Sequence, residues 1–346
     1  NSGPLPCSGT NEKIVMKHTD IIKTLNLEQK CALLSGETVF TTRDFSEKGI
    51  PAITLSDGPN GVRKQAGAAD HLGLNPSVPA TCFPTAATVA CSWDPALGEQ
   101  LGRAMGEEAA AQEVSVLLGP GLNTKRSPLC GRNFEYYSED PVLAGELAAG
   151  YINGVQSQGV GTSIKHFAAN SQEYRRMSAS SDMTERTLRE IYLPAFETAV
   201  KKSQPWTVMC SYNRVNDVFA SENRMLLTDI LRTEWNFKGF VMSDWGAVAD
   251  RVKGVAAGLD LEMPGSGGVN DAKIVAAVKA GTLSEAALNK AAAHSGNERP
   301  VAGYPLCFAQ MMGVAVVERI IFCYDSYCFA HSYSPSFIMF ILAIII

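Results

Sequence analysis

The chain is short of positive charge and of histidine. Its 346 residues carry 30 Lys and Arg against 35 Asp and Glu, a formal net charge of -5, and only 5 His. Because no excess of cations is present to hold phosphates, nucleic acid is not a predicted partner. The histidines show no spacing typical of a metal cluster, so no metal or other cofactor is predicted. A neutral or weakly polar small molecule fits this composition better.

The sequence also lacks paired cysteines and a secretory leader. Nine cysteines are present, with no CxxC pair and no cysteine–histidine cluster of zinc-finger spacing. The first residues show no charged segment followed by an apolar run. We therefore expect reduced thiols in a cytoplasmic protein.

Long apolar runs and several familiar catalytic signatures are missing as well. The final run SFIMFILAIII is shorter than the roughly 18–20 residues that span a bilayer, which disfavours a membrane-attached protein. No GxSxG elbow, Walker loop or HExxH motif occurs, and GPGLN at 119–123 alone does not make a dinucleotide fingerprint. The reactions that depend on those signatures are poorly supported.

Three segments of the chain differ in pattern. Residues 1–15 show no periodicity and are predicted to be a non-native or disordered leader, with Met16 as the true start. Residues 16–293 are long enough for one large domain. Residues 294–346 form a discordant apolar tail, interpreted as a membrane-associated tail, a buried terminal element, or a non-native end of a truncated or frame-shifted gene. The last is favoured, because a resemblance to a known family ends where the composition changes.

Residues 16–293 alternate short apolar runs with amphipathic stretches, a pattern typical of βα units around a parallel sheet. We expect strands at 52–56, 114–118, 162–165, 207–211, 240–243 and 259–262. Helices are expected at 18–36, 95–111, 141–158, 185–202, 224–235 and 271–280. This α/β pattern predicts a (β/α)8 TIM-type barrel whose remaining strands are weakly marked. An incomplete barrel and a doubly wound open sheet are the alternatives.

Polar residues of several different kinds directly follow the predicted strands. In a parallel barrel all strand ends share one rim, and active sites form on that rim. The residues, in SDGPNGVR, KHF, SYN, SDWGA and DLEMPG, are Asp57, Arg63, Lys165, His166, Tyr212, Asp244, Trp245 and Glu262.

Each such residue, taken alone, has a structural interpretation. Asp57 before Gly-Pro is typical of a turn, and Asp244 of a helix N-cap. His166 and Trp245 are typical of buried core positions, and Arg132 has carboxylate partners within CGRNFEYYSEDP. As a set at successive strand ends, however, they favour a functional site.

The set suits sugar binding, because each sugar hydroxyl both donates and accepts hydrogen bonds. An aromatic face such as Trp245 packs on the apolar side of a pyranose ring. One carboxylate beneath the anomeric carbon can act as nucleophile, and a retaining enzyme needs a second carboxyl about 5–5.5 Å away. Lys165 and Arg132 are expected to hold Asp244 ionised.

Six motifs between Ile21 and Ala293 resemble those of glycoside hydrolase family 3, in its bacterial β-glucosidase branch that lacks signal peptides. They are LSDGPNGVRKQ, ATCFPTAATVACSWDP, VLLGPGLNTKRSPLCGRNFEYYSEDP, GTSIKHFAANSQEYRRM, TVMCSYNRVN and GFVMSDWGAVADR. The resemblance implies a barrel followed by a separate α/β sandwich domain, with the sugar held at their junction. KHFAANSQEYRRM lacks the glycine-rich Asp–His segment of the N-acetylglucosaminidase branch, which disfavours that branch.

The resemblance also implies residue roles. Asp244, in the family's SDW motif, would be the nucleophile, and Trp245 would line the pocket. Residues implied to contact the glycone are Asp57, Arg132, Lys165, His166 and Tyr212, with Arg63 a weaker candidate.

One departure from the family pattern concerns the acid/base glutamate, which lies in the second domain of this branch. We expect no such domain after the barrel in this sequence, and no glutamate near the predicted site matches that position. The predicted function is hydrolysis of terminal non-reducing β-D-glucosyl residues from a small β-glucoside or oligosaccharide, by double displacement through Asp244. The alternatives are a truncated, weakly active or inactive sugar-binding barrel, and a β-xylosidase or α-arabinofuranosidase. The oligomeric state is left open.

Overall fold

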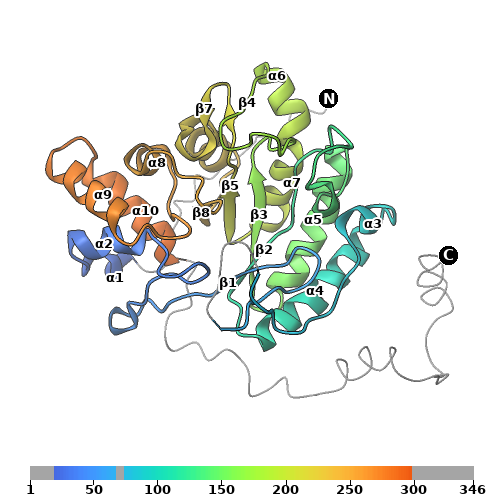
Figure 1. The fold of residues 1–346 in the computed structure, drawn as a ribbon, viewed down its shortest axis with the longest axis horizontal. Helices are drawn as coiled ribbons and strands as arrows, with labels where there is room; N and C mark the ends of the chain where they lie inside the picture. The colour runs from blue at the N-terminus through green and yellow to red at the C-terminus, as the bar shows by residue number, and fades with distance from the viewer. Residues whose placement is uncertain (1–18, 68–73, 298–346) are drawn as a thin grey trace, which may run out of the picture. The chain divides into compact units, whose positions relative to one another are not determined.

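The computed structural model describes residues 19–67 and 74–297 (Figure 1). The predicted leader at 1–15 and nearly all of the predicted tail at 294–346 lie outside these ranges. Within them, no helix is long and apolar enough to cross a membrane. The five cysteines that they contain, Cys31, Cys82, Cys91, Cys130 and Cys210, carry free thiols.

A five-stranded parallel sheet organises the fold. Its strands pair in chain order: β1 (Leu55–Asp57), β2 (Val116–Leu118), β3 (Gly161–Phe167), β5 (Thr207–Cys210) and β8 (Phe240–Ser243). Parallel neighbours need a crossover connection, and helices supply it here (Figure 1). The predicted α/β fold with a parallel sheet is confirmed, and the five strands coincide with five of the six predicted runs.

Isolated bridges continue the backbone pairing beyond both edges of this sheet. Parallel bridges join β8 to residues 261–262 and these to Ser35, and antiparallel bridges then lead back to the start of β1. The bridged pairs are Met242–Leu261, Ser35–Glu262, Gly36–Thr42 and Thr41–Thr54. The pairing thus runs round from β8 to β1, as in a barrel. Two of its links are antiparallel, unlike the predicted repeat of parallel βα units, and the predicted strand at 259–262 pairs only through such bridges.

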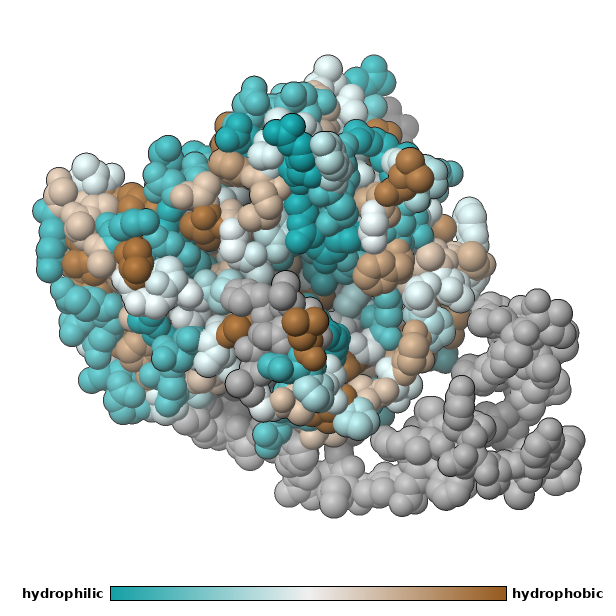
Figure 2. Space-filling view, in the orientation of Figure 1, coloured by the Kyte–Doolittle hydropathy of each residue, from teal (hydrophilic) through white to brown (hydrophobic). Residues whose placement is uncertain are grey.

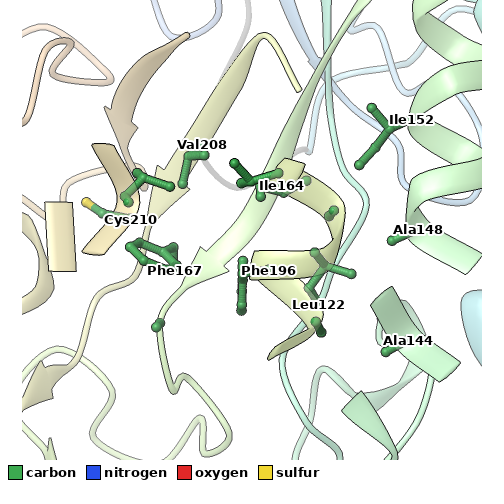
Figure 3. Close-up of a cluster of buried hydrophobic side chains, with 14 of the residues drawn as sticks. Leu122, Ala144, Ala148, Ile152, Ile164, Phe167, Phe196, Val208 and Cys210 are labelled. Atoms are coloured by element: carbon green, nitrogen blue, oxygen red, sulfur yellow. The ribbon is translucent and has the colours of Figure 1, made fainter. Parts of the chain in front are cut away.

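The two faces of the sheet carry different apolar clusters, because side chains alternate along a strand. One cluster lies on the inner face and combines residues of β1, β2, β5 and β8 with residues of the bridged segments beyond the sheet: Ile53, Leu55, Val116, Leu118, Met209, Phe240, Met242, Leu261 and Met263. The other joins the outer face to the helices. Figure 3 shows it, with Ile164, Phe167, Val208 and Cys210 on the strands facing Phe196, Ile152 and Ala148 on the helices. An inner cluster of this kind favours the barrel over the open sheet.

The helices begin where their capping residues predict. Asp94 and Asp140 cap α4 (Pro95–Ala111) and α5 (Pro141–Gln156), each with proline in the first turn. The prediction of 95–111 is confirmed, and α5 ends two residues before its predicted end. The predicted helix at 18–36 is wrong, because Asn26 caps a second helix there and divides it into α1 (Thr19–Lys23) and α2 (Leu27–Leu33).

The predicted helix at 185–202 is also divided, into α6 (Glu185–Thr187), the π-helix η3 (Leu188–Tyr192) and α7 (Pro194–Ser203). The predicted helix at 224–235 is a π-helix, η5 (Met225–Glu234). The C-terminal helices are α8 (Arg251–Ala257), α9 (Val269–Lys279) and α10 (Glu285–Asn297). The short elements are η1 (Ser46–Lys48), α3 (Ala86–Ala90), η2 (Asn133–Glu135), β4 (Ser180–Ser181), β6 (Arg214–Val215), β7 (Val218–Phe219) and η4 (Ala220–Glu222).

Candidate active site

The carboxyl ends of the parallel strands bring the predicted site residues to one end of the sheet. Asp57 is the last residue of β1, and Asp244 directly follows β8. Both continue the inner face, because Leu55 and Met242, two residues earlier, belong to the inner cluster. Figure 2 shows hydrophilic residues gathered in a hollow near the middle of the face on which Figure 1 labels β3.

Asp244 is 6% exposed, and its two carboxylate oxygens have different surroundings. Oδ1 accepts a hydrogen bond of 2.7 Å from the backbone N–H of Trp245. Oδ2 lies 3.5 Å from His166 Nε2 and 4.0 Å from Arg132 Nη1. Within the described residues Oδ2 has no hydrogen-bond partner. One carboxylate oxygen is therefore anchored by a hydrogen bond, and the other is not.

Burial raises the pKa of Asp244 above its ordinary value. The positive charges of Arg132 and Lys165, the Trp245 N–H and the Tyr212 hydroxyl oppose that rise. The two cations act in the predicted direction. Desolvation of the buried carboxylate outweighs them, so the pKa of Asp244 is raised on balance.

Both cations pair first with Glu135, the last residue of η2, which is 2% exposed. Arg132 Nε donates to Oε1, and Lys165 Nζ lies 3.2 Å from Oε2. The structural interpretation of Arg132 as an ion-pair partner within its own loop is thus confirmed. The same guanidinium also faces Asp244, with Nη1 4.0 Å from Oδ2.

His166 is fully buried and held from three directions. Its Nδ1 lies 2.9 Å from the hydroxyl of Tyr136. Its backbone N–H donates to Asn123 Oδ1 at 2.7 Å, and the Asn123 amide donates back to its carbonyl oxygen at 2.9 Å. Burial, with Arg132 and Lys165 nearby, holds the pKa of His166 well below its ordinary value, so the ring is neutral. Sequence analysis had missed Asn123, although it ends the quoted GPGLN run.

Tyr212 and Trp245 form the aromatic side of the site. The Tyr212 hydroxyl donates to the Trp245 carbonyl oxygen at 2.9 Å, and Trp245 Nε1 donates to the Val39 carbonyl oxygen at 2.6 Å. The Trp245 ring lies 5.4 Å from that of Phe40. Arg176 was not predicted, yet its guanidinium lies 4.2 Å from the centre of the Tyr212 ring. It occurs within the quoted motif GTSIKHFAANSQEYRRM, so the signal was present.

Two predicted residues stand apart from this group. Arg63 is joined to Asp57 by a backbone bridge, its side chain is exposed, and it lines a cavity of about 320 Å³ together with Phe40. Glu262, expected on the rim, instead accepts a hydrogen bond of 2.6 Å from Asn270. It points outward because Leu261 and Met263 on either side take the inner face.

No group of three or more His, Cys, Asp or Glu placed to share a metal ion occurs in residues 19–67 and 74–297. The assembled set at the site is an anchored buried carboxylate, two cations, a neutral imidazole and aromatic rings. Such groups offer donors, acceptors and an apolar surface to a polyhydroxylated ring.

Known proteins resemble this chain over the same region. Over 271 residues it is 60% identical to thermostable beta-glucosidase B of Acetivibrio thermocellus, covering 78% of this chain and 36% of that protein. It is 53% identical over 272 residues to an exo-alpha-(1->6)-L-arabinopyranosidase of Bifidobacterium breve, with the same coverage of 78% and 36%. The chain thus spans about a third of the length of these relatives.

Solved structures agree. A GH3 beta-glucosidase from Bifidobacterium adolescentis matches with a TM-score of 0.75 and 50% identity, over 80% of this chain and 39% of that one. Beta-glucosidase 3B from Thermotoga neapolitana, in complex with alpha-D-glucose, matches with a TM-score of 0.76 and 41% identity, over 82% and 44%. The model of the glycosyl hydrolase family 3 N terminal domain matches residues 20–295. The chain therefore belongs to glycosyl hydrolase family 3.

Proposed function

We propose that this chain carries the sugar-binding and nucleophile-bearing part of a retaining β-glucosidase. The observation that carries the proposal is that Asp244 Oδ2 lies between His166 and Arg132 without a hydrogen bond within the described residues. The names of its relatives support it, since beta-glucosidases from bacteria and fungi match at 45–60% identity. The substrate is a small β-glucoside or oligosaccharide.

In the first step Asp244 Oδ2 attacks the anomeric carbon. The new C–O bond to the enzyme forms as the bond to the aglycone oxygen breaks, and a general acid gives that oxygen a proton. In the second step a general base deprotonates water, which displaces Asp244 and releases glucose. Arg132, Lys165, neutral His166, Asp57 and Tyr212 bind glycone hydroxyls, and Trp245 packs on the ring; Arg63 lies at the margin of this group.

Glu135 is a poor general acid, because Arg132 and Lys165 lower its pKa against the effect of burial. We propose that the acid/base carboxyl lies outside the described residues. The share of the relatives that the chain covers, 36%, supports this placement. We propose likewise that residues 16–293 form the barrel domain, in line with the family match at 20–295.

A second candidate function is hydrolysis of α-L-arabinopyranosides, favoured by the arabinopyranosidase that shares 53% identity. A pyranoside lacking the C6 hydroxymethyl group would use the same nucleophile. The β-xylosidase and α-arabinofuranosidase alternatives are tested with the glycosides of the corresponding sugars. Relative kcat/KM for the p-nitrophenyl glycosides of these sugars separates the candidates.

The first experiment is release of p-nitrophenol from p-nitrophenyl β-D-glucoside by the purified chain, with and without azide. Two inversions through Asp244 give β-glucosyl azide, whereas Asp244→Ala can give only the α-azide by direct displacement. Azide-stimulated formation of the β-product supports Asp244 as nucleophile. Absence of any glucosyl transfer by the wild-type chain, with or without azide, would favour the inactive sugar-binding barrel instead.

A cytoplasmic location is part of the proposal. The free thiols of the five described cysteines support it, because reducing compartments keep thiols unpaired. Fractionation of the source cells, with immunodetection of the chain, tests it.

A further inference from the structure

Glu135 places one carboxylate oxygen on each of the two cations of the site. Oε1 accepts from Arg132 Nε, and Oε2 faces Lys165 Nζ at 3.2 Å. The side chains of Glu135, Arg132 and Lys165 are 2%, 21% and 4% exposed, so this ion-paired group is largely removed from water. Arg132 directly precedes η2 and Glu135 ends it, whereas Lys165 lies on β3, so one carboxylate links two separate elements.

The next residue continues this arrangement. Tyr136 is fully buried, and its hydroxyl lies 2.9 Å from His166 Nδ1. The backbone here docks closely on Gly121, since a Cβ at Gly121 would lie 2.7 Å from the Glu135 carbonyl oxygen. Two successive residues therefore hold three of the side chains assigned to the glycone.

We propose that Glu135 is a positioning residue that keeps Arg132 and Lys165 aimed at the sugar and out of a close ion pair with the nucleophile, while Tyr136 fixes the orientation of the His166 ring. The inference rests on the proposed function. A buried cation that loses its counter-charge turns to the nearest remaining anion. Arg132 Nη1 already lies 4.0 Å from Asp244 Oδ2, so that oxygen would become its partner.

Loss of the Glu135 charge is expected to change the ionisation of Asp244. The groups that face this carboxylate are Arg132 from the loop after β2, Lys165 and His166 from β3, and Tyr212 from the segment after β5. Neutralising Glu135 leaves the positive charge of Arg132 and Lys165 uncompensated, which favours ionised Asp244 and lowers its pKa. The variant would then hold a nucleophile that ionises more readily but is shielded by an ion pair.

The test measures labelling of Asp244 by 2,4-dinitrophenyl 2-deoxy-2-fluoro-β-D-glucoside, whose leaving group needs no acid. Intact-mass spectrometry follows the glycosyl adduct, and its rate gives Ki and the maximal rate as functions of pH. The variants are Glu135→Gln, Glu135→Asp and Tyr136→Phe. Glu139→Gln is the matched control, because Glu139 is an exposed carboxylate in the same loop. Melting temperature is recorded for each variant.

For Glu135→Gln we expect Ki to rise at least about tenfold and the acid limb to move to lower pH by about one pH unit. Glu135→Asp keeps the charge but reaches less far, so Ki rises while the acid limb stays with the wild type. Tyr136→Phe raises Ki by a smaller factor. Loosened packing would instead move the limb in both Glu135 variants, because water would enter in either case.

The outcomes separate failure of the positioning role of Glu135 from failure of the proposed function. If the wild-type chain is labelled and Glu135→Gln matches Glu139→Gln in Ki and acid limb, the positioning inference is overturned while the nucleophile stands. If the wild-type chain is not labelled at Asp244, the proposed function fails, and the inference fails with it. Should Glu135→Gln not fold, Glu135→Asp decides, since equality with Glu139→Gln in Ki overturns the inference.

Discussion

His166 Nε2 and Asp244 Oδ2 face each other at 3.5 Å, and neither has a hydrogen-bond partner within the described residues. Buried polar atoms are almost always satisfied, so such a pair at strand ends is typical of a site that a ligand completes. A neutral imidazole can donate a hydrogen bond to a hydroxyl group, and a carboxylate can accept one from the same group. In the proposed function, this pair lies where a sugar ring would meet the nucleophile.

The neutrality of His166 can be measured directly. Its pKa lies well below the ordinary value because of burial and the nearby cations Arg132, Lys165 and Arg176. We expect its ring carbon resonances to stay constant from about pH 5 to 8, where an unperturbed histidine titrates at about 6.5. Nuclear magnetic resonance of selectively labelled histidine checks this, with His166→Asn used to assign the signal. A midpoint near 6.5 would contradict the placement of this ring.

The raised pKa of Asp244 predicts that Asp244→Asn stabilises the chain at neutral pH. The folded state holds this proton more tightly than the unfolded state, so the wild type loses stability as pH rises from about 3.9 through the folded-state value. Asparagine avoids that loss. We therefore expect Asp244→Asn to have a higher free energy of unfolding than the wild type at pH 7.

Urea unfolding of wild type and Asp244→Asn across about pH 3.5 to 7.5 tests this. The difference in free energy of unfolding should be small at the acid end and open as pH rises. Asp182→Asn, at an exposed aspartate, is the matched control for the loss of one carboxylate. A wild-type protein more stable than Asp244→Asn at pH 7 would show that the fold favours the charged form.

Local signals explain which parts of the fold the sequence could predict. The start of α4 was predictable because Asp94 and Pro95 are cap and first-turn signals that act within a few residues. The π-helix η5 was not, because the choice between i→i−4 and i→i−5 bonding depends on how a helix packs against its neighbours. The bridges that carry pairing from β8 back to β1 join residues far apart in the chain, and no local pattern specifies them.

In the candidate site too, local sequence predicts some features and distant contacts set the others. Placing Asp244 needed only an apolar strand and the polar residue after it. The outward turn of Glu262 could have been inferred from alternation, since Leu261 and Met263 are apolar neighbours that claim the inner face. Which carboxylate of CGRNFEYYSEDP turns inward could not, because Glu135 is selected by Lys165 on another strand.

The buried ion pair of Asp260 and Arg232 predicts that substitution of Asp260 lowers the stability of the chain strongly. Asp260 is 1% exposed, pairs with Arg232, accepts from the Val241 N–H at 2.8 Å and lies 3.0 Å from His294 Nδ1. Asp260→Asn should cost about 3–5 kcal/mol at pH 7, because it leaves the buried Arg232 unpaired. Urea unfolding measures this, and Arg232→Met in the same chain should recover part of the loss.

The pH dependence of this group has a defined sign. Arg232 and His294 hold the pKa of Asp260 below its ordinary value against burial. Its contribution is therefore present above the unfolded value of about 3.9 and is lost as pH falls through the lower folded value. A penalty for Asp260→Asn that shrinks only in that acid range supports the pairing. A penalty independent of pH would indicate that packing, not charge, is what the substitution removes.

The contact between α4 and α5 predicts that a substitution favourable to an isolated helix is harmful here. A Cβ at Gly102 would lie 2.2 Å from the Tyr151 carbonyl oxygen, and one at Gly154 would lie 2.1 Å from that of Glu99. Alanine favours a helix over glycine by up to about 1 kcal/mol. The two backbones must nevertheless separate to admit a methyl group, and overpacking of this kind costs about 1–3 kcal/mol. We therefore expect Gly102→Ala to lower the free energy of unfolding and the melting temperature. Gln100→Ala, exposed on the same helix, should leave both nearly unchanged, and a Gly102→Ala chain as stable as wild type would mean that α4 and α5 are not packed this closely.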